Sequence, residues 1–227
     1  MSDKPKIVYP WSDKSFSGTK DDKIAVYDEL SRLGYPIKSL QKTPSELVQT
    51  LLHVLMTKFF LAAGEWVCLI SDSAFFLREV CDALPVVFAL TKSRAPMTVT
   101  NETVSLHMSH AAKGHSIIDL TDSQKFIRHA ETAGLLVWEN INQETPFGSK
   151  YGSKFLELLT ARLKRPKTSN LFTLLCRQDW NEDAVRAMYM QQVEAVFGQT
   201  ATAIIEERCI FKTAMVRKKM GLKIDKD

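Results

Sequence analysis

The sequence has no long apolar stretch and none of the short motifs that usually identify a serine hydrolase, a zinc protease or a dinucleotide enzyme. No run reaches the about 18 to 20 apolar residues that span a bilayer. The start, MSDKPKIVYPWSDKS, lacks the apolar centre of a signal peptide. The patterns G-x-S-x-G, H-E-x-x-H and G-x-G-x-x-G are absent. We therefore expect a cytoplasmic protein with no membrane partner and without those three chemistries.

Cysteine and histidine are scarce, and their spacing gives little support to a metal site or a disulfide framework. The four cysteines stand far apart, three of them in apolar stretches: Cys68, Cys81, Cys176 and Cys209. Buried reduced thiols are the favoured interpretation. The spacing of His107, His110 and His115 could gather a metal. Because no Cys or acidic ligand is close by, surface or hydrogen-bonded histidines are favoured instead.

What the sequence does contain is a mild excess of positive charge in two clusters. The 227 residues carry a formal net charge of +4 and have a pI near 8.8, which is compatible with nucleic-acid binding without indicating it. The clusters are Arg162, Lys164, Arg165 and Lys167, and Arg217, Lys218, Lys219 and Lys223. We expect these side chains, Lys223 apart, to contact DNA phosphates. The alternative is a pair of solvated helix ends, where cations also suit the helix dipole.

The length and composition predict one domain with an N-terminal appendage. Residues 1–22 are rich in Pro, Ser, Gly, Lys and Asp and are predicted to form a flexible arm. Residues 23–227 are predicted to form a single α/β domain. It begins with a helical extension, consisting of a short helix over 24–33 and a strongly apolar helix from Pro44 to Gly64.

Continuous apolar runs predict buried strands. The runs at 67–70, 135–138 and 171–176 show no polar alternation, as expected of strands covered on both faces. Amphipathic helices are predicted between them, and residues 91–103 are predicted to be largely a polar linker. This alternation predicts a three-layer α/β domain with a mainly parallel sheet and helices on both faces. Ligands of such sheets bind at the carboxyl ends of the strands.

One acidic residue stands at such a strand end. Glu139 follows the run GLLVW, and in phosphate-loop ATPases a carboxylate at this place holds magnesium and orients the attacking water. A single acid is present where a pair is usual. Glu139 is therefore a candidate catalytic residue, and an ordinary polar strand end is the alternative.

From this point the chain resembles the helicase-loader and replication-initiator branch of the AAA+ ATPases, which includes the ATP-binding subunits of some transposases. The resemblance rests on the order GLLVWENI, FGSKYGSKFLELLTARLKRP and NLFTLLCR, and it runs from about Pro44 to Val216. It implies a P-loop NTPase fold, DNA as a ligand, and a replicative helicase, an initiator or an AAA+ paralogue as a partner. The segment IIEERCIFKTAMVR is similar to the one in which these proteins place an arginine that faces nucleotide, which implies this role for Arg208.

The phosphate loop that this resemblance implies is degenerate. The stretch ISDSAFFLREV keeps the strand and the helix start, but it lacks the glycines and the Lys-Ser/Thr pair that bind a triphosphate and magnesium. Asp72 would repel a phosphate, and Phe75 and Phe76 replace the lysine and the hydroxyl. Conventional binding of ATP and magnesium is therefore not expected. Ser71 and Ser73 could still contact an anion through backbone N–H groups, which keeps unusual nucleotide binding as an alternative.

Three functions are left open by the sequence. The first is a catalytically silent replication accessory protein of helicase-loader type that binds DNA or a protein as a scaffold. The second is a working ATPase that uses Glu139 and Arg208. The third is a protein-interaction module without DNA binding, in which the apolar stretch 47–60 packs a homo-oligomer. A helical stripe of this kind is more often part of a core.

Overall fold

The computed structural model describes residues 28, 44–57, 61, 64–92, 95–113, 117–142, 152–165, 167–176 and 182–216. Three predicted features lie outside these residues: the arm over 1–22, the helix over 24–33 apart from Asp28, and the second cationic cluster with Arg217, Lys218 and Lys219. The residues at the strand ends lie within them.

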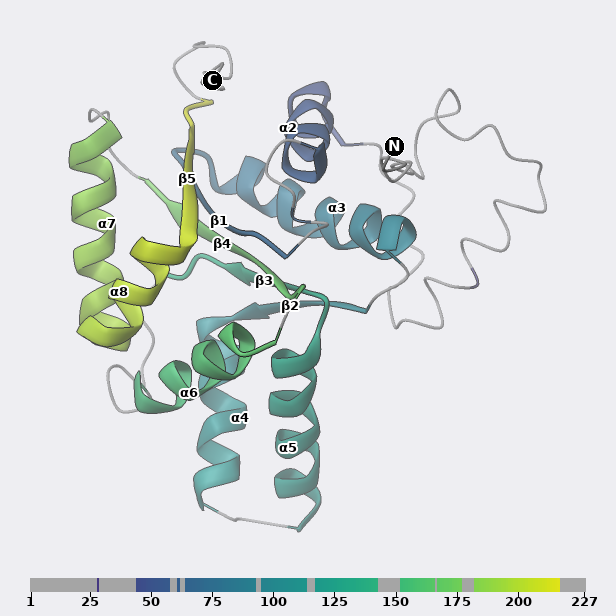
Figure 1. Ribbon diagram of the computed structural model, residues 1–227, viewed down its shortest axis with the longest axis vertical. Helices are drawn as coiled ribbons and strands as arrows, with labels where there is room; N and C mark the ends of the chain where they lie inside the picture. The colour runs from purple at the N-terminus through teal and green to yellow at the C-terminus, as the bar shows by residue number, and fades with distance from the viewer. Residues whose placement is uncertain are drawn as a thin grey trace.

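Five parallel strands form one sheet in the order β2-β3-β4-β1-β5 (Figure 1). Their bounds are β1 Trp66–Ser71, β2 Pro96–Thr100, β3 Leu135–Glu139, β4 Ser169–Leu175 and β5 Cys209–Ala214. The register places Ser71, the last residue of β1, beside Leu175 of β4 and Ala214 of β5. These three strands therefore end together at one edge of the sheet.

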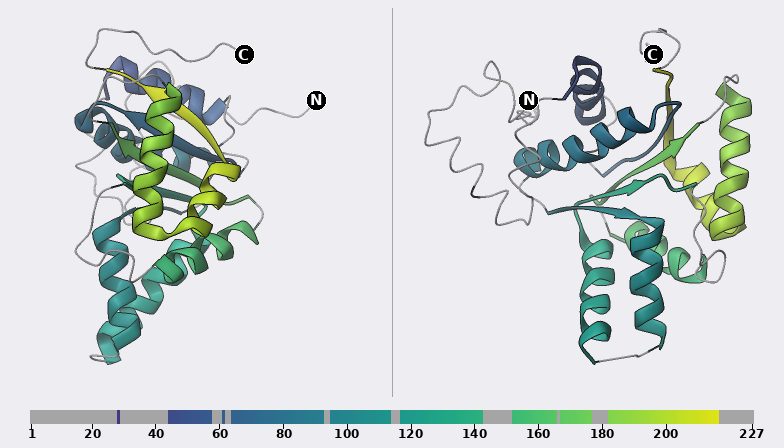
Figure 2. Two further views of the ribbon diagram at one scale, coloured as in Figure 1. Left: turned by 90° about the vertical axis from the view of Figure 1, so that its left-hand side faces the viewer. Right: turned by 180° about the vertical axis from the view of Figure 1, so that it is seen from behind.

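Helices cover both faces of this sheet, which confirms the predicted three-layer α/β fold (Figures 1 and 2). Their bounds are α2 Glu46–Thr57, α3 Ala74–Lys92, α4 Asn101–Lys113, α5 Ile117–Thr132, α6 Gly152–Leu163, α7 Glu182–Phe197 and α8 Gln199–Arg208. Helices α2 and α3 lie over one face, and α6, α7 and α8 lie over the other. Helices α4 and α5 pack against each other and project away from the sheet.

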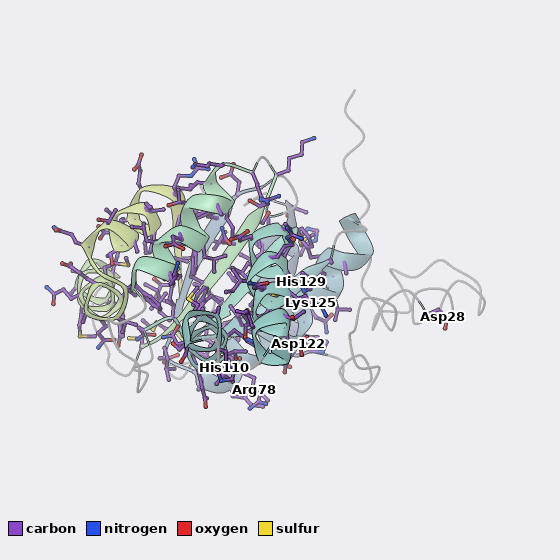
Figure 3. All side chains as sticks on the ribbon, turned by 90° about the horizontal axis from the view of Figure 1, so that it is seen from below. Asp28, Arg78, His110, Asp122, Lys125 and His129 are labelled. Atoms are coloured by element: carbon purple, nitrogen blue, oxygen red, sulfur yellow. The ribbon has the colours of Figure 1, made fainter. Side chains whose placement is uncertain are left out.

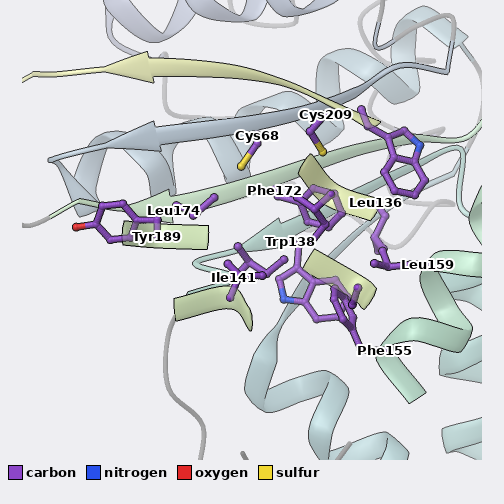
Figure 4. Packing of buried hydrophobic residues seen from close by; sticks show 14 of the residues in the cluster. Cys68, Leu136, Trp138, Ile141, Phe155, Leu159, Phe172, Leu174, Tyr189 and Cys209 are labelled. Carbon is purple, nitrogen blue, oxygen red and sulfur yellow. The ribbon is translucent and has the colours of Figure 1, made fainter. Parts of the chain in front are cut away.

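Side chains of each central strand alternate between two apolar cores. In β1, Val67 and Leu69 face the layer of α2 and α3, whereas Cys68 and Ile70 face the opposite layer (Figure 4). Burial of one such side chain contributes about 1.5 to 3 kcal/mol. Because both faces are covered, the strands have no polar side, and this is why they are visible in the sequence as continuous apolar runs.

The core on the side of α6, α7 and α8 is built around Trp138. Trp138 is fully buried and packs edge-on against Phe155, with ring centroids 4.7 Å apart. Its indole N–H donates a hydrogen bond of 2.6 Å to the Asn101 side-chain oxygen, which satisfies the one polar group of the ring. Phe197 lies on the same tryptophan at 5.9 Å. This cluster fixes α6 and α7 against β3 and thereby positions the carboxyl end of that strand.

Two segments differ from their interpretation in the sequence. Residues 96–100, expected in a polar linker, form the edge strand β2, of which only Pro96 and Val99 are buried. Proline fits this place because it is the first residue of an edge strand. The apolar helix α2 packs into the core with α3 through Val48, Leu52 and Leu55. The apolar stripe that pointed to a homo-oligomer is therefore used within the chain.

Candidate functional site

The candidate site lies at the carboxyl edge of the sheet, where β1, β3 and β4 end. Ser71 closes β1 and Glu139 closes β3, and β4 runs between these two strands. Ser73 follows directly in the turn to α3. The fold therefore brings together three of the predicted site residues at the edge where parallel sheets bind ligands.

The turn between β1 and α3 is short and is closed by its own side chains. Only Asp72 and Ser73 separate the end of β1 at Ser71 from the start of α3 at Ala74. The Phe76 N–H donates to the Ser73 hydroxyl oxygen at 3.2 Å, which makes Ser73 the N-cap of the helix. The Ser73 N–H itself donates to the Ser71 hydroxyl oxygen at 3.3 Å. A phosphate loop of the form G-x-x-x-x-G-K-[ST] needs a longer stretch whose N–H groups converge on the ligand.

The same turn is hydrogen-bonded to both neighbouring strands. The Ser71 hydroxyl donates to the Ala214 carbonyl at 2.5 Å, and the Val216 N–H donates to Asp72 Oδ1 at 2.7 Å. On the other side, the Cys176 N–H donates to the Ser71 carbonyl at 2.6 Å. Asp72 is only 7% exposed. The carboxylate therefore points into the protein, toward the end of β5.

The two phenylalanines after the turn have different environments. Phe76 is 3% exposed and belongs to the core under α2 and α3, whereas Phe75 is 67% exposed. In a phosphate loop these positions carry the lysine and the hydroxyl that contact the triphosphate and magnesium. A phenyl ring offers neither a cation nor a magnesium ligand in either place.

Glu139 is half-buried and faces charged residues of α3. Burial raises the pKa of its carboxyl group, the positive charge of Arg78 lowers this pKa, and the negative charge of Asp82 raises it. Arg78 is thus the cation that lowers the pKa of Glu139, the candidate catalytic acid, and it is not among the residues predicted from the sequence. Its position one turn into α3 is the signal that could have been used, since α3 begins at the same edge.

The backbone after Glu139 is held in an unusual conformation. Asn140 has a φ of 48°, and its N–H donates to the Thr173 hydroxyl of β4 at 2.9 Å. The side-chain oxygen of Asn140 is buried and has no hydrogen-bond partner among the described residues. Asn142 then exchanges two hydrogen bonds of 3.3 Å with the backbone of Leu175. These contacts fix the direction of Glu139 relative to β4.

Arg208 lies at the opposite edge of the sheet from Glu139. It is the last residue of α8 and precedes β5, whose first residue pairs with Trp66 at the start of β1. β1 runs over six residues from Trp66 at this edge to Ser71 at the other, which is about 17 Å for five steps of about 3.3 Å. The role of Arg208 as an arginine that faces nucleotide stays a prediction, and the structure separates Arg208 from the turn at Ser71 in the same chain by the length of β1. Parallel register is the reason, because a residue that precedes a strand lies at the amino edge.

Arg162 has a structural position, and its assignment to the DNA-contact set is wrong. The side chain is 0% exposed. Its Nε donates to Asn170 Oδ1 at 2.6 Å, and Nη2 donates to the Ser169 carbonyl at 2.6 Å. Its Nη1 donates to the carbonyls of Ala130 and Ala133 at 2.7 and 3.0 Å. Burial lowers the pKa of the guanidinium to about 9, so the group remains charged at neutral pH.

The other three residues of the first cluster are exposed at the amino edge. Lys164, Arg165 and Lys167 lie between α6 and β4. Lys167 has a φ of 65°, and its backbone packs closely on Gly64, where a Cβ would lie 2.8 Å from the Lys167 Cα. The second cluster, with Arg217, Lys218 and Lys219, lies outside the described residues.

The described histidines and cysteines have structural environments, and His115 lies outside the described residues. His107 on α4 is hydrogen-bonded to the Ser123 hydroxyl at 3.3 Å and stacks on Phe126 of α5 at 4.0 Å, and burial lowers the pKa of its imidazole. His110 lies on the same helix, and His129 lies on α5 (Figure 3). All four cysteines are buried free thiols. Within the described ranges, no group of three His, Cys, Asp or Glu side chains could hold a metal ion.

None of the helices described in the structure is long and apolar enough to cross a membrane.

The fold has relatives among solved structures of replication proteins. The chain matches no protein-family model and no curated protein. The crystal structure of the DnaC helicase loader aligns with a TM-score of 0.55 and 13% identity, over 76% of this chain and 93% of that one. The replication initiator DnaA bound to AMPPCP and single-stranded DNA aligns with a TM-score of 0.52 and 8% identity, over 77% of this chain and 47% of that one. The chain therefore has the parallel-sheet AAA+ fold that these helicase-loader and initiator structures share.

Proposed function

We propose that this chain is a DNA replication accessory protein that uses the AAA+ fold as a scaffold for DNA and protein partners and does not hydrolyse ATP in the conventional way. The observation that carries the proposal is the two-residue turn between β1 and α3. In place of a loop that wraps phosphates, this turn has a helix cap from Ser73 and a buried carboxylate from Asp72 that is bonded to the Val216 N–H.

Charge supports the same conclusion for the triphosphate. A carboxylate next to a phosphate is repulsive, and at about 4 Å this repulsion is about 4 kcal/mol at the effective dielectric near a protein surface. Phe75 and Phe76 supply no compensating cation. The dipole of α3 favours an anion at its N-terminus, and Asp72 already provides one. The turn is thus hydrogen-bonded within the chain, through the Ser73 cap and the Asp72 carboxylate.

The alternative of a working ATPase is less well supported by the geometry. Glu139 is at the right edge to orient a water molecule. Arg208 is at the other edge, so it could reach only a nucleotide bound by a second copy of the chain. Residual nucleotide binding would need a cation near the turn. Arg78 on α3, whose positive charge acts on Glu139, is the candidate for this contact. Glu139→Gln is predicted to leave phosphate release from ATP unchanged at background level.

The proposed DNA contacts fall into two sets. Lys164, Arg165 and Lys167 at the amino edge form the first, and Arg217, Lys218 and Lys219 form the second. Exposed acids of the amino edge, Glu65, Glu206 and Glu207, moderate the positive potential there. We therefore expect moderate, sequence-tolerant and strongly salt-dependent binding to phosphates.

The kind of protein partner is proposed from the fold relatives. One of them is named a helicase loader, and the other is a replication initiator solved with single-stranded DNA. A replicative helicase, an initiator or an AAA+ paralogue is the corresponding partner for this chain, with a homo-oligomer as a further assembly. Size-exclusion chromatography with light scattering on the full chain separates a monomer from a closed ring or an open filament.

The DNA assignment is tested with charge-neutralising variants of the full chain. We expect the variant K164Q/R165Q/K167N to bind a labelled single strand more weakly and to reduce the slope of log K against log salt by about two, at about 0.7 per lost contact. Asn is used at position 167 because it tolerates the left-handed backbone of Lys167. Lys154→Gln, an exposed lysine on α6 that pairs with Glu157 at 2.7 Å, is the matched control. Unchanged affinity and slope in the triple variant would remove the amino edge from the DNA surface.

A further inference from the structure

Helices α4 and α5 form a hairpin that is joined to the rest of the fold at its base. The hairpin projects away from the sheet (Figures 1 and 2). Asn101, the first residue of α4, donates through Nδ2 to the Ile141 carbonyl at 3.0 Å and accepts the Trp138 indole N–H at 2.6 Å. Val104 on α4 and Ala130 on α5 belong to the core around this tryptophan. The base of the hairpin is therefore fixed to β3 and to the chain that follows it.

In the middle of the hairpin, the two helices meet through a histidine. His107 of α4 and the hydroxyl of Ser123 on α5 share a hydrogen bond of 3.3 Å through the Nδ1 atom of the ring. Ser123 is a buried residue with 1% of its surface exposed. The imidazole also stacks on the Phe126 ring of α5, with the centroids 4.0 Å apart and the planes inclined by 19°. A charge on His107 is therefore a charge in the contact between the helices.

The charged neighbours of this ring, among the described side chains, come from both helices. His110 stands one turn further along α4, and Asp122 on α5 is paired with the exposed Lys125 at 3.5 Å (Figure 3). Burial lowers the pKa of the His107 imidazole, the charge of His110 lowers it further, and the charge of Asp122 raises it. Stacking on Phe126 favours a cation and acts with Asp122. Burial is the largest effect, so the packed hairpin favours the neutral ring.

We propose that His107 is a pH-sensitive contact of the α4–α5 hairpin, which loosens the packing of these two helices when the solution becomes mildly acidic. The folded pKa of His107 lies below its unfolded value of about 6.5. The stability that neutral His107 contributes is therefore present above the unfolded pKa and is lost as pH falls through the folded pKa. The sheet keeps its packing, because the base of the hairpin is held by Asn101. The inference concerns two packed helices and does not depend on the proposed function.

The titration is tested by NMR of the full chain, with the His107 ring assigned by sequential connectivity. We expect its midpoint to lie below that of the histidine in the peptide SLHMS, which has the sequence around His107, under the same conditions. His110→Gln should raise the midpoint of His107, because one neighbouring positive charge is removed. This measurement on the wild type needs no variant to fold. A midpoint equal to or above that of the peptide would overturn the proposal.

The effect on helix packing is tested by hydrogen exchange of the Ile127 amide of α5, expressed as protection relative to an unstructured peptide at the same pH. We expect this protection to fall between about pH 7 and about pH 5 in the wild type. The loss should reach about tenfold for each pH unit by which the His107 midpoint lies below that of the peptide.

His107→Gln is the matched variant for this exchange experiment, because glutamine keeps a hydrogen-bonding group for Ser123 and does not titrate. We expect the Ile127 protection of this variant to lack the loss that the wild type shows. The core amide of Leu171 in β4 should respond to pH equally in both proteins, which separates loosening of the hairpin from global unfolding. The same loss of Ile127 protection in the wild type and in His107→Gln would contradict the proposal.

Discussion

The sharpest prediction about the stability of this fold concerns the buried side chain of Arg162. Replacement by methionine removes a fully buried guanidinium that donates four hydrogen bonds, three of them to backbone carbonyls and one to the Asn170 side chain. Two of the carbonyls are those of Ala130, in the last turn of α5, and Ala133, directly after that helix, where no helical N–H follows to satisfy them. The arginine therefore ties the last turn of α6 to that of α5 and to β4.

The magnitude follows from the groups left behind. Removing one partner of a buried, hydrogen-bonded charge costs about 3 to 5 kcal/mol, and each buried acceptor left unsatisfied costs about 1 to 3 kcal/mol. Relief of the desolvated charge offsets part of this sum, since burial disfavours the charged guanidinium. We expect a net loss of about 3 to 5 kcal/mol, which for a chain of this size lowers Tm by about 6 to 20 °C.

Urea unfolding followed by circular dichroism measures this loss, with Arg165→Met as the matched control. Arg165 is three residues away and exposed, and its replacement is expected to change stability by less than about 0.5 kcal/mol. Arg162→Lys keeps the charge but loses the planar fork and should fall between the two. A loss of less than about 1 kcal/mol in Arg162→Met would show that the hydrogen bonds of Arg162 do not hold α5, α6 and β4 together.

Three further predictions concern the turns and the candidate acid. Gly64→Ala, at a φ of 107° and with its new Cβ 2.8 Å from the Lys167 Cα, should cost about 2 to 4 kcal/mol in urea unfolding. Gly198→Ala has open space around its new Cβ and should cost about 1 to 3 kcal/mol, from its backbone conformation of φ 84° and ψ 161° alone. Ser73→Ala should cost about 1 kcal/mol through the lost helix cap, and Ser73→Asn should recover most of it; equal stability of all three proteins would argue against the cap. For Glu139 the folded pKa lies above the unfolded value, so its contribution is present at low pH and is lost as pH rises through the folded pKa. Glu139→Gln should therefore raise Tm at neutral pH but not at pH 4, as differential scanning calorimetry would measure.

The fold could be predicted from the sequence because its central strands are buried on both faces. The continuous apolar runs in β1, β3 and β4 leave no other place for these segments than the middle of a sheet. The edge strand β2 was missed because only two of its five residues, Pro96 and Val99, are buried, and the pattern PMTVT has two threonines and a proline. A half-buried strand of five residues carries too little signal to be separated from a linker.

Arg162 was assigned to the surface because it stands among other cations, yet a signal for its burial was present. Phe155, Leu158, Leu159 and Arg162 occupy positions i, i+3, i+4 and i+7 of α6, which is the buried stripe of an amphipathic helix. Lys164 and Arg165 come after the helix end at Leu163 and do not follow this periodicity. The prediction for Arg162 followed the neighbouring cations in the sequence. In the structure, its position on the buried stripe of α6 decides its burial.

Long-range contacts at the site were beyond reach from one sequence. Asp72 was expected to repel a phosphate, but its bond to the Val216 N–H joins residues 144 positions apart. The position of Arg208 depends on the parallel pairing of β5 with β1, which a single sequence does not show. Both contacts become visible only once the register of the sheet is known.

The central claim is that the turn after β1 is closed by its own side chains, Ser73 and Asp72, and does not bind a triphosphate. Isothermal titration of the full chain with ATP and magnesium at millimolar concentration tests it most directly. The account predicts no saturable heat and no change when Glu139 is replaced by Gln. A one-site isotherm that requires magnesium would contradict the account, because a triphosphate would then bind a chain whose turn after β1 is closed by Asp72 and Ser73.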